Sequence, residues 1–323
     1  MDRNARIFVA GGTTLIGAAL LRQLREQAFT NLVGMPPAEP DFCSAAEVDD
    51  FFRRVRPDYV FYAAGRSGGI QTNQSFPADL MLDNLLAATH VIDAAHRHRV
   101  SKLLYLASSC CYPRHCPQPM RVDSLGTGLL EPTNDAYATA KIAGLKLCQA
   151  YARQHGAPFL CGIPANAFGI EDDFSPEGGH VIPALIARLH DAKVESRPAV
   201  TIWGTGAPRR EFIFADDLAD ACLFVLREYA DTQTPINLGC GVDLSIRETA
   251  ELIRHVVGYA GELKFDHTRP DGMPLKSLDS TPLARLGWQP RTPIIMALTE
   301  TYEAFLAGRR LPEQEGIHVR AAV

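Results

Sequence analysis

The sequence predicts an α/β fold, a Rossmann-type doubly wound parallel sheet joined to a smaller α/β substrate-binding domain. Short β-branched runs alternate with amphipathic segments from the N-terminus onward, a pattern typical of βαβ units around a parallel sheet. The first run ends in a glycine-rich turn that leads directly into a helical pattern. Beyond about residue 165, loops rich in glycine, proline and acidic residues interrupt the alternation, which indicates a second layer.

The elements of the first half follow from their hydrophobic spacing. Continuous apolar runs predict strands at 6–10, 32–33, 58–63 and 102–107. Apolar residues at helical spacing predict helices at 14–27, 45–54, 80–97 and 135–155.

The second half is expected to return to the first sheet before it ends in helices. A helix is expected at 213–229, a strand at 236–238, and helices near 245–258 and 294–307. We therefore expect a dinucleotide-binding domain from residues 1–165 plus about 213–243. A substrate domain is expected from about 166–212 plus 244–323.

Length and composition bound the function classes. The chain has 323 residues, enough for one large domain or two interlocked smaller ones at roughly 150 residues per domain. Its content of 46% hydrophobic and 21% charged residues argues against collagen-like, disordered and coiled-coil classes. A net charge of −5 provides no electrostatic reason to expect a nucleic acid or an anionic membrane as partner.

The first residues and the cysteines indicate a cytoplasmic protein without a metal site. The start carries an acid and only a short apolar run, unlike a signal peptide or a membrane span. The eight cysteines lack a repeated CxxC spacing, which argues against zinc. In the cytoplasm most of them are expected to be small buried hydrophobic residues rather than disulfide partners.

The turn after the first strand is a candidate cofactor site. Gly11 and Gly17 occupy the outer positions of a GxxGxxG pattern, and Thr14 stands where the middle glycine belongs. Glycine lets the backbone approach a pyrophosphate, whose charge meets the free N–H groups at the start of a helix. An ordinary tight turn is the alternative.

The segment after the second strand leaves the choice between NAD and NADP open. An acid there selects a ribose 2′-hydroxyl, and an arginine selects a 2′-phosphate. Glu39 lies in a proline-rich loop and is expected to be a solvated charge, whereas Asp41 and Phe42 lie where such folds often contact adenine.

Tyr137 and Lys141 lie four residues apart and thus on one face of a helix. A tyrosine donates a proton to a developing alkoxide more readily if a nearby cation lowers its pKa from about 10. Ser108 follows a buried strand and is delivered to the carboxyl edge of the sheet, where such folds bind ligands. Dehydrogenase chemistry is indicated by the order of three features along the chain: the glycine-rich turn, then the serine, then the YxxxK pair.

With these residues, the chain resembles the extended short-chain dehydrogenase/reductase family, and within it the epimerase/reductases of GDP-4-keto-6-deoxy sugars. The segments that carry the resemblance are SGGI at 67–70, SSCCYP at 108–113, EPTNDAYATAKIAG at 131–144, GGHVIPALI at 178–186, WGTGAPRREFIFADDLA at 203–219 and DGMPLKSLD at 271–279.

The resemblance implies C3/C5 epimerisation followed by reduction of the C4 ketone. The ketone acidifies the hydrogens on C3 and C5, and Cys110 and His180 match the cysteine and histidine that move those protons. A thiolate base needs a positive neighbour, which sequence does not reveal. Without the resemblance, Cys110 is a small buried residue and His180 a polar residue at a helix start.

The resemblance also implies contact residues, including Ser108, Tyr137 and Lys141 as catalytic groups. We expect cofactor contacts at Gly11, Gly12, Thr13, Thr14, Leu15, Ile16, Gly17, Asp41, Phe42, Leu106, Ala107, Ser108, Ser109, Tyr137, Lys141, Pro164, Ala165, Asn166, Ala167 and His180. We expect substrate contacts at Ser108, Ser109, Cys110, Asn166, Arg188, Trp203, Arg210, Asp271 and Lys276. Relatives form homodimers, which implies a homodimer here.

The cofactor implied is NADP(H). Thr13, Thr14 and Met35 stand where NADPH-dependent relatives have the middle glycine and basic side chains, so NAD(H) is an alternative. A reductase of a related GDP-4-keto sugar, such as a heptose, without epimerisation is one alternative activity. A nucleotide-sugar 4-epimerase or 4,6-dehydratase is another, and a dinucleotide-sensing regulator is the non-enzymatic alternative.

Overall fold

The computed structural model describes residues 1–35, 37–175, 180–269, 271 and 273–310. Its larger sheet confirms the predicted fold class. Six strands are hydrogen-bonded in the order β2-β1-β3-β4-β5-β9, and every neighbouring pair is parallel. The strands are β1 (Ile7–Ala10), β2 (Leu32–Val33), β3 (Tyr59–Tyr62), β4 (Lys102–Leu106), β5 (Phe159–Pro164) and β9 (Ile236–Leu238).

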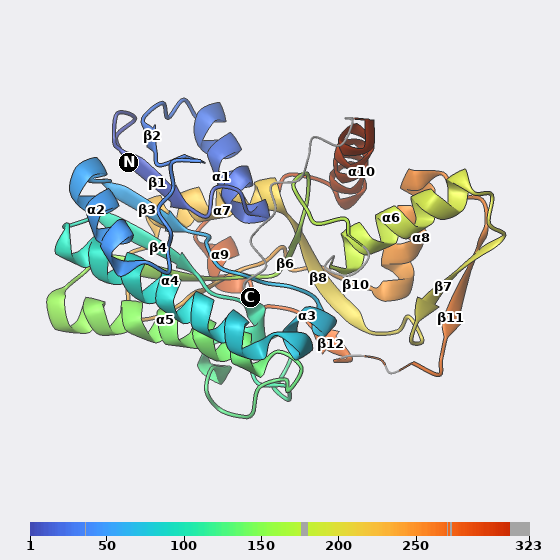
Figure 1. Ribbon diagram of the computed structural model, residues 1–323. Coiled ribbons are helices and arrows are strands. Elements are labelled where there is room, and N and C mark those ends of the chain that lie inside the picture. The colour runs from blue at the N-terminus through green and yellow to red at the C-terminus, as the bar shows by residue number, and fades with distance from the viewer. Residues whose placement is uncertain (36, 176–179, 270, 272, 311–323) are drawn as a thin grey trace.

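The helices of this part pack in pairs over the sheet (Figure 1). Helix α1 packs against α7, and α4 packs against α5 and α2. Their bounds are α1 (Leu15–Glu26), α2 (Ala45–Val55), α3 (Ile70–Ser75), α4 (Pro77–Arg97), α5 (Asp135–His155) and α7 (Ala215–Glu228), with 3-10 turns η1 (Ser109–Cys111) and η2 (Val122–Ser124). The strand order changes direction between β2 and β3, at β1, so the carboxyl ends of β1 and β3 mark the switch point where such folds bind ligands.

A second group of elements lies at the other end of the molecule in Figure 1. Strand β8 (Arg209–Phe214) pairs with β6 (Asn166–Phe168), β10 (Asp243–Ser245) and β12 (Leu275–Lys276). Strands β7 (Ala199–Trp203) and β11 (Glu262–Asp266) form a separate parallel pair. The helices of this group are α6 (Val181–Val194), α8 (Ile246–Val257) and α10 (Ile294–Arg310), whereas α9 (Thr281–Arg285) packs against β9 of the larger sheet.

Strand β8 is shared between two hydrophobic cores. Ile213 packs into the core of the six-stranded sheet, whereas Phe212 and Phe214 pack into a second core with α6, α8 and α10. Successive side chains of a strand point to opposite faces, so one strand contributes to both cores. The division of the chain into two domains stays a prediction, since this strand belongs to both sides.

The predicted elements differ from the structure mainly at β8 and β5. The helix expected from Ile213 begins at Ala215, and 209–214 form a strand that is buried on both faces and so lacks polar alternation. Strand β5 was not anticipated, and its six residues are all buried. Helix α4 begins at Pro77 rather than Leu80, because proline is well suited to the first turn of a helix.

Among the described helices, none combines the length and the apolar composition that a membrane crossing requires. All eight cysteines are free. Four of them are buried, three are partly buried and Cys43 is exposed, so the expectation that most are buried holds for only half.

Candidate active site

The glycine-rich turn has the close packing that its glycines allow. Gly11 has φ of +84°, and a Cβ there would collide with the backbone of Ala64; a Cβ at Gly17 would collide with the carbonyl oxygen of Gly11. Thr14 is accommodated as the N-cap of α1, where its hydroxyl donates to the Gly11 carbonyl at 2.8 Å and accepts from Gly17 N–H at 3.1 Å. The amides of Leu15 and Ile16 make no hydrogen bond within the described residues.

The prediction that Glu39 is a solvated loop charge is wrong, because its carboxylate is hydrogen-bonded to the glycine-rich turn. Its Oε1 accepts hydrogen bonds from Gly11 N at 2.7 Å and Gly12 N at 2.9 Å, which ties the proline-rich loop to the turn. Burial raises the pKa of Glu39, and the two amides partly offset that rise. Phe42 lies near Phe8, with ring centroids 6.3 Å apart, whereas Asp41 is exposed.

Tyr137, Lys141 and Ser108 meet at the carboxyl edge of the sheet. Lys141 is buried in α5, and its ammonium donates to the carbonyls of Ala64 at 3.4 Å and Leu106 at 3.3 Å. Burial lowers the pKa of Lys141 to about 8. Its Nζ lies 5.9 Å from the centroid of the Tyr137 ring.

The pKa of Tyr137 is raised, whereas the sequence led us to expect that a nearby cation lowers it. Burial raises it, with the charges of Cys110 and Cys111 as further causes, and a hydrogen bond with the Ser108 side chain offsets part of the rise. Desolvation of the phenolate is the largest cause of the rise. The phenol is therefore protonated at neutral pH and available as a donor.

Cys110 lies beside this group with two hydrogen-bond donors on its sulfur. The Lys276 ammonium approaches Sγ at 3.4 Å and the Asn134 amide nitrogen at 3.3 Å. Lys276 comes from β12 and Asn134 immediately precedes α5. Asn134 was not among the predicted site residues, because its only sequence signal is its place just before Tyr137.

His180 lies at the start of α6, as predicted. Burial of its ring and then the charge of Lys276 lower the pKa of His180, although part of the residue remains exposed, and Asp173 acts in the opposite direction. The structure thus places Lys276 close enough to influence both Cys110 and His180. The neighbouring residues 178 and 179 lie outside the described part of the chain.

The remaining predicted cofactor residues line the ends of β4 and β5. Leu106, Ala107 and Ser109 are buried after β4, and Pro164, Ala165 and Ala167 surround the junction of β5 and β6. The amide of Asn166 donates to the Glu211 carbonyl at 2.8 Å, so this side chain joins β6 to β8.

Predicted substrate residues lie on α6 (Arg188), β7 (Trp203), β8 (Arg210) and the segment before β12 (Asp271). Trp203 exposes 68% of its surface, and the Arg269 guanidinium lies 4.9 Å from the ring centroid. Asp271 accepts from Thr205 N at 2.9 Å and Thr205 Oγ1 at 2.7 Å. Arg188 donates to the Thr201 carbonyl, and burial lowers the pKa of Arg188. Arg269 was not predicted.

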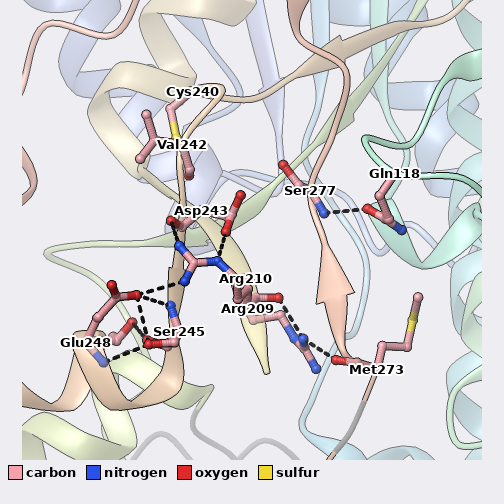
Figure 2. Close-up of polar contacts among 11 residues, drawn as sticks. Gln118, Arg209, Arg210, Cys240, Val242, Asp243, Ser245, Glu248, Met273 and Ser277 are labelled. Carbon is pink, nitrogen blue, oxygen red and sulfur yellow. Dashed lines mark hydrogen bonds and ion pairs between the residues drawn. The ribbon is translucent and has the colours of Figure 1, made fainter. Parts of the chain in front are cut away.

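Figure 2 shows that Arg209 and Arg210 point in opposite directions. Arg209 pairs with Asp243 and Glu248. Arg210 donates to the Met273 carbonyl at 2.6 Å, and burial lowers its pKa while Asp271 acts in the opposite direction. Arg210 is thus the arginine of the pair without a carboxylate in direct contact among the described residues.

Comparison with known proteins places this geometry in a family. The model of the NAD dependent epimerase/dehydratase family matches residues 7–239. The chain belongs to this family. The extended short-chain dehydrogenase/reductase resemblance inferred from the sequence is thereby confirmed.

Relatives of this epimerase/dehydratase chain cover nearly its whole length. It is 49% identical over 305 residues to GDP-L-fucose synthase 1 of Arabidopsis thaliana, covering 94% of each chain. It is 43% identical over 309 residues to GDP-L-fucose synthase of Escherichia coli K12, covering 93% of this chain and 96% of the relative. Among solved structures, a GDP-mannoheptose C4 reductase from Campylobacter jejuni with NADP bound is 31% identical with a TM-score of 0.87, covering 95% and 99%.

Proposed function

We propose that the protein is an NAD(P)H-dependent epimerase/reductase of a GDP-4-keto-6-deoxy sugar. One observation carries the proposal: Cys110 lies at the same sheet edge as Ser108, Tyr137 and Lys141, so a proton-moving thiol accompanies a reductase triad. Similarity to enzymes named GDP-L-fucose synthase supports this substrate class.

The reductase triad suits reduction of the C4 ketone. The bound dinucleotide supplies the hydride. Ser108 holds the ketone oxygen, and the Tyr137 phenol donates its proton to the alkoxide that develops there. Lys141 is fixed by two carbonyls and is placed to hold a ribose hydroxyl. The pKa of Lys141, lowered to about 8 by burial, still leaves it largely protonated at pH 7.

Cys110 and His180 suit epimerisation before reduction. The C4 ketone acidifies the C3 and C5 hydrogens, so the Cys110 thiolate takes a proton from carbon and leaves an enolate. The His180 imidazolium then returns a proton to that carbon from the opposite side. Burial and then the charge of Lys276 lower the pKa of His180 from its ordinary 6.5, so the protonated donor is already the minority form at neutral pH and becomes scarcer as pH rises.

The exposed Trp203 and the partly buried Arg210 suit the nucleotide of the substrate. A flat indole face stacks on a purine base, and an arginine fork donates two hydrogen bonds to a pyrophosphate. Asp271 lies close enough to Arg210 to influence its pKa and carries acceptors for sugar hydroxyls or a guanine edge.

We propose NADP(H) as the cofactor, in line with the relative that has NADP bound. The amides of Leu15 and Ile16 fit a pyrophosphate at the start of α1. NADH is a second candidate, because Thr13 and Met35 are uncharged and the nearby Glu39 is acidic. Competitive fluorescence titration with NADPH and NADH decides between them.

The activity is tested with GDP-4-keto-6-deoxymannose and NADPH or NADH in deuterated water, with the product sugar identified by NMR. We expect deuterium at C3 and C5 and reduction at C4. Tyr137→Phe should slow reduction by about 100-fold to 10,000-fold. Cys110→Ser should abolish deuterium incorporation, and unchanged incorporation would refute the role of Cys110.

A second candidate is a C4 reductase of a GDP-heptose that does not epimerise its substrate; the Campylobacter jejuni neighbour named a GDP-mannoheptose C4 reductase supports this substrate class. In that case GDP-4-keto-heptose is reduced without deuterium uptake, and Cys110→Ser retains turnover.

We further propose a homodimer through α4 and α5, since Leu82 of α4 exposes 56% of its surface. Light scattering after gel filtration tests the assembly.

A further inference from the structure

We propose that Lys276 is the positioning residue that holds the sulfur of Cys110 as a thiolate, and that the Asn134 amide completes its donor set. The inference rests on the proposed function, because a thiolate is the form of cysteine that takes a proton from carbon. It assigns to Lys276 a role other than the substrate contact expected from sequence.

The first observation is the position of Lys276 on β12. This strand pairs in parallel with β8, with Lys276 opposite Arg210. Because side chains alternate along a strand, Leu275 and Ser277 face a cavity of about 650 Å³ on the other side, and Lys276 faces Cys110. Ser277 N is fixed on Gln118 Oε1 at 3.1 Å (Figure 2).

The second observation is the hydrogen bonding of the Asn134 side chain. Asn134 is the N-cap residue of α5 but makes no capping hydrogen bond. Its Nδ2 donates to Cys110 Sγ instead, and its buried Oδ1 has no hydrogen-bond partner in the described structure. An asparagine at this position usually caps the helix, so contact with the sulfur replaces a stabilising interaction.

The surroundings of the sulfur favour a negative charge. Within the described residues, both hydrogen-bond contacts of Cys110 Sγ come from donors, and one donor is an ammonium. Tyr137 and Cys111 also face this sulfur, and the pKa of each is raised, so both are neutral at pH 7. A cation beside a thiol is the usual means of stabilising its thiolate.

The same ammonium acts on His180 in the opposite direction. Lys276 contributes to the lowered pKa of His180, after burial, and Asp173 partly opposes both. Removal of the Lys276 charge should therefore make the thiolate less favourable and the imidazolium more favourable. A residue that only filled space would produce neither effect.

The test measures Cys110 directly and needs no substrate. Alkylation by iodoacetamide is followed by peptide mass spectrometry from pH 5.5 to 9.5, in the full chain and in Lys276→Met. We expect the rate at pH 7 to fall about tenfold in the variant and to recover at high pH, since only the thiolate reacts. Lys276→Arg should restore most of the rate. Lys264→Met, which removes an exposed lysine of β11, is the matched control and should leave the profile unchanged.

Two further measurements keep the outcome decisive if Lys276→Met folds poorly. Asn134→Asp places a carboxylate against the sulfur and should slow alkylation at pH 7, whereas Asn134→Leu should slow it less. NMR titration of His180 in Lys276→Gln, which removes the charge but keeps a polar side chain, should show its midpoint moved upward. Identical alkylation profiles in the full chain and both Lys276 variants would overturn the proposal. A normal Lys276 effect without deuterium uptake from solvent would instead refute the proposed epimerase function alone.

Discussion

Single residues of the site illustrate how burial decides protonation. Asp172 precedes the segment that leads to His180, and burial raises the pKa of Asp172 to about 7. Its Oδ1 accepts from Asp173 N at 2.9 Å, while its buried Oδ2 has no partner within the described residues. Ionisation of this side chain therefore costs stability in the folded state.

The pH dependence of stability should reveal Asp172. The pKa of Asp172 in the folded chain lies above its usual value of 3.8. The protonated carboxyl therefore contributes its full stabilisation of the folded state below about pH 4, and this stabilisation is lost as pH rises through about 7. Asp172→Asn should therefore gain about 1–3 kcal/mol relative to the unmodified chain between pH 5 and pH 8 in urea denaturation. Glu303→Gln, which removes an exposed carboxylate of α10, is the control and should retain the original pH dependence; parallel curves for all three proteins would contradict this account.

Some contacts between single residues of the site could be predicted from the sequence, and others could not. The structure brings Tyr137, Lys141 and Ser108 together, because helix periodicity and the strand end fix their places, and their catalytic roles stay a prediction. The role of Glu39 was predicted wrongly, since a polar loop residue carries no sign of the amides that it contacts. The contact of Lys276 with Cys110 joins residues 166 positions apart, and no local pattern encodes it.

At the scale of elements, α5 is the part that sets the catalytic pair against the sheet. Gly144 lies one turn beyond Lys141, and a Cβ at Gly144 would collide with the phenol of Tyr105. That phenol donates to the Lys141 carbonyl at 3.2 Å, so helix and sheet are joined at this point. The close approach needs glycine.

Gly144→Ala should therefore displace α5 or Tyr105 and destabilise the protein by about 1–3 kcal/mol, with a loss of reduction rate. Gly308 of α10 is a helical glycine where an added Cβ would meet no neighbouring atom within 4 Å, so Gly308→Ala is the matched control. That control should be neutral or more stable by up to about 1 kcal/mol. Chemical denaturation compares them, and equal stabilities would show that the Tyr105 contact is unimportant.

The bounds of helices and strands were predicted well where the hydrophobic residues follow a regular helix or strand spacing. The bounds of α5 and β9 match the prediction, and those of α8 differ from it by one residue at each end. It was poor at β8, because a strand that serves two cores has apolar side chains on both faces and shows no alternation.

At the scale of the whole molecule, Asn237 joins distant segments in the interior. This buried residue of β9 donates to the carbonyls of Met120 at 2.9 Å and Asp279 at 3.1 Å. It accepts from the Tyr112 hydroxyl at 2.6 Å. The loop that follows Cys110 and the chain that follows Lys276 thus meet at one amide.

Asn237→Leu should leave the Tyr112 hydroxyl and the Asp279 carbonyl unpaired in the interior and cost about 2–4 kcal/mol of unfolding free energy, whereas the Met120 carbonyl keeps its hydrogen bond from Asp279 N at 2.9 Å. Tyr112→Phe removes only one of the hydrogen bonds and should cost about 1 kcal/mol. Urea denaturation of both variants provides the comparison. If Asn237→Leu proved no worse than Tyr112→Phe, the amide would not be the junction described here.

The separation of Cys110 from Lys276 along the chain has a consequence for biosynthesis. Ser108, Tyr137 and Lys141 all leave the ribosome at least 135 residues before Lys276, the difference between 141 and 276. At about 5–20 residues per second, the delay lasts roughly 7–27 seconds. Throughout that interval the thiol of a nascent chain has no ammonium from Lys276 beside it, so the proposed thiolate site is assembled only after residue 276 has been synthesised.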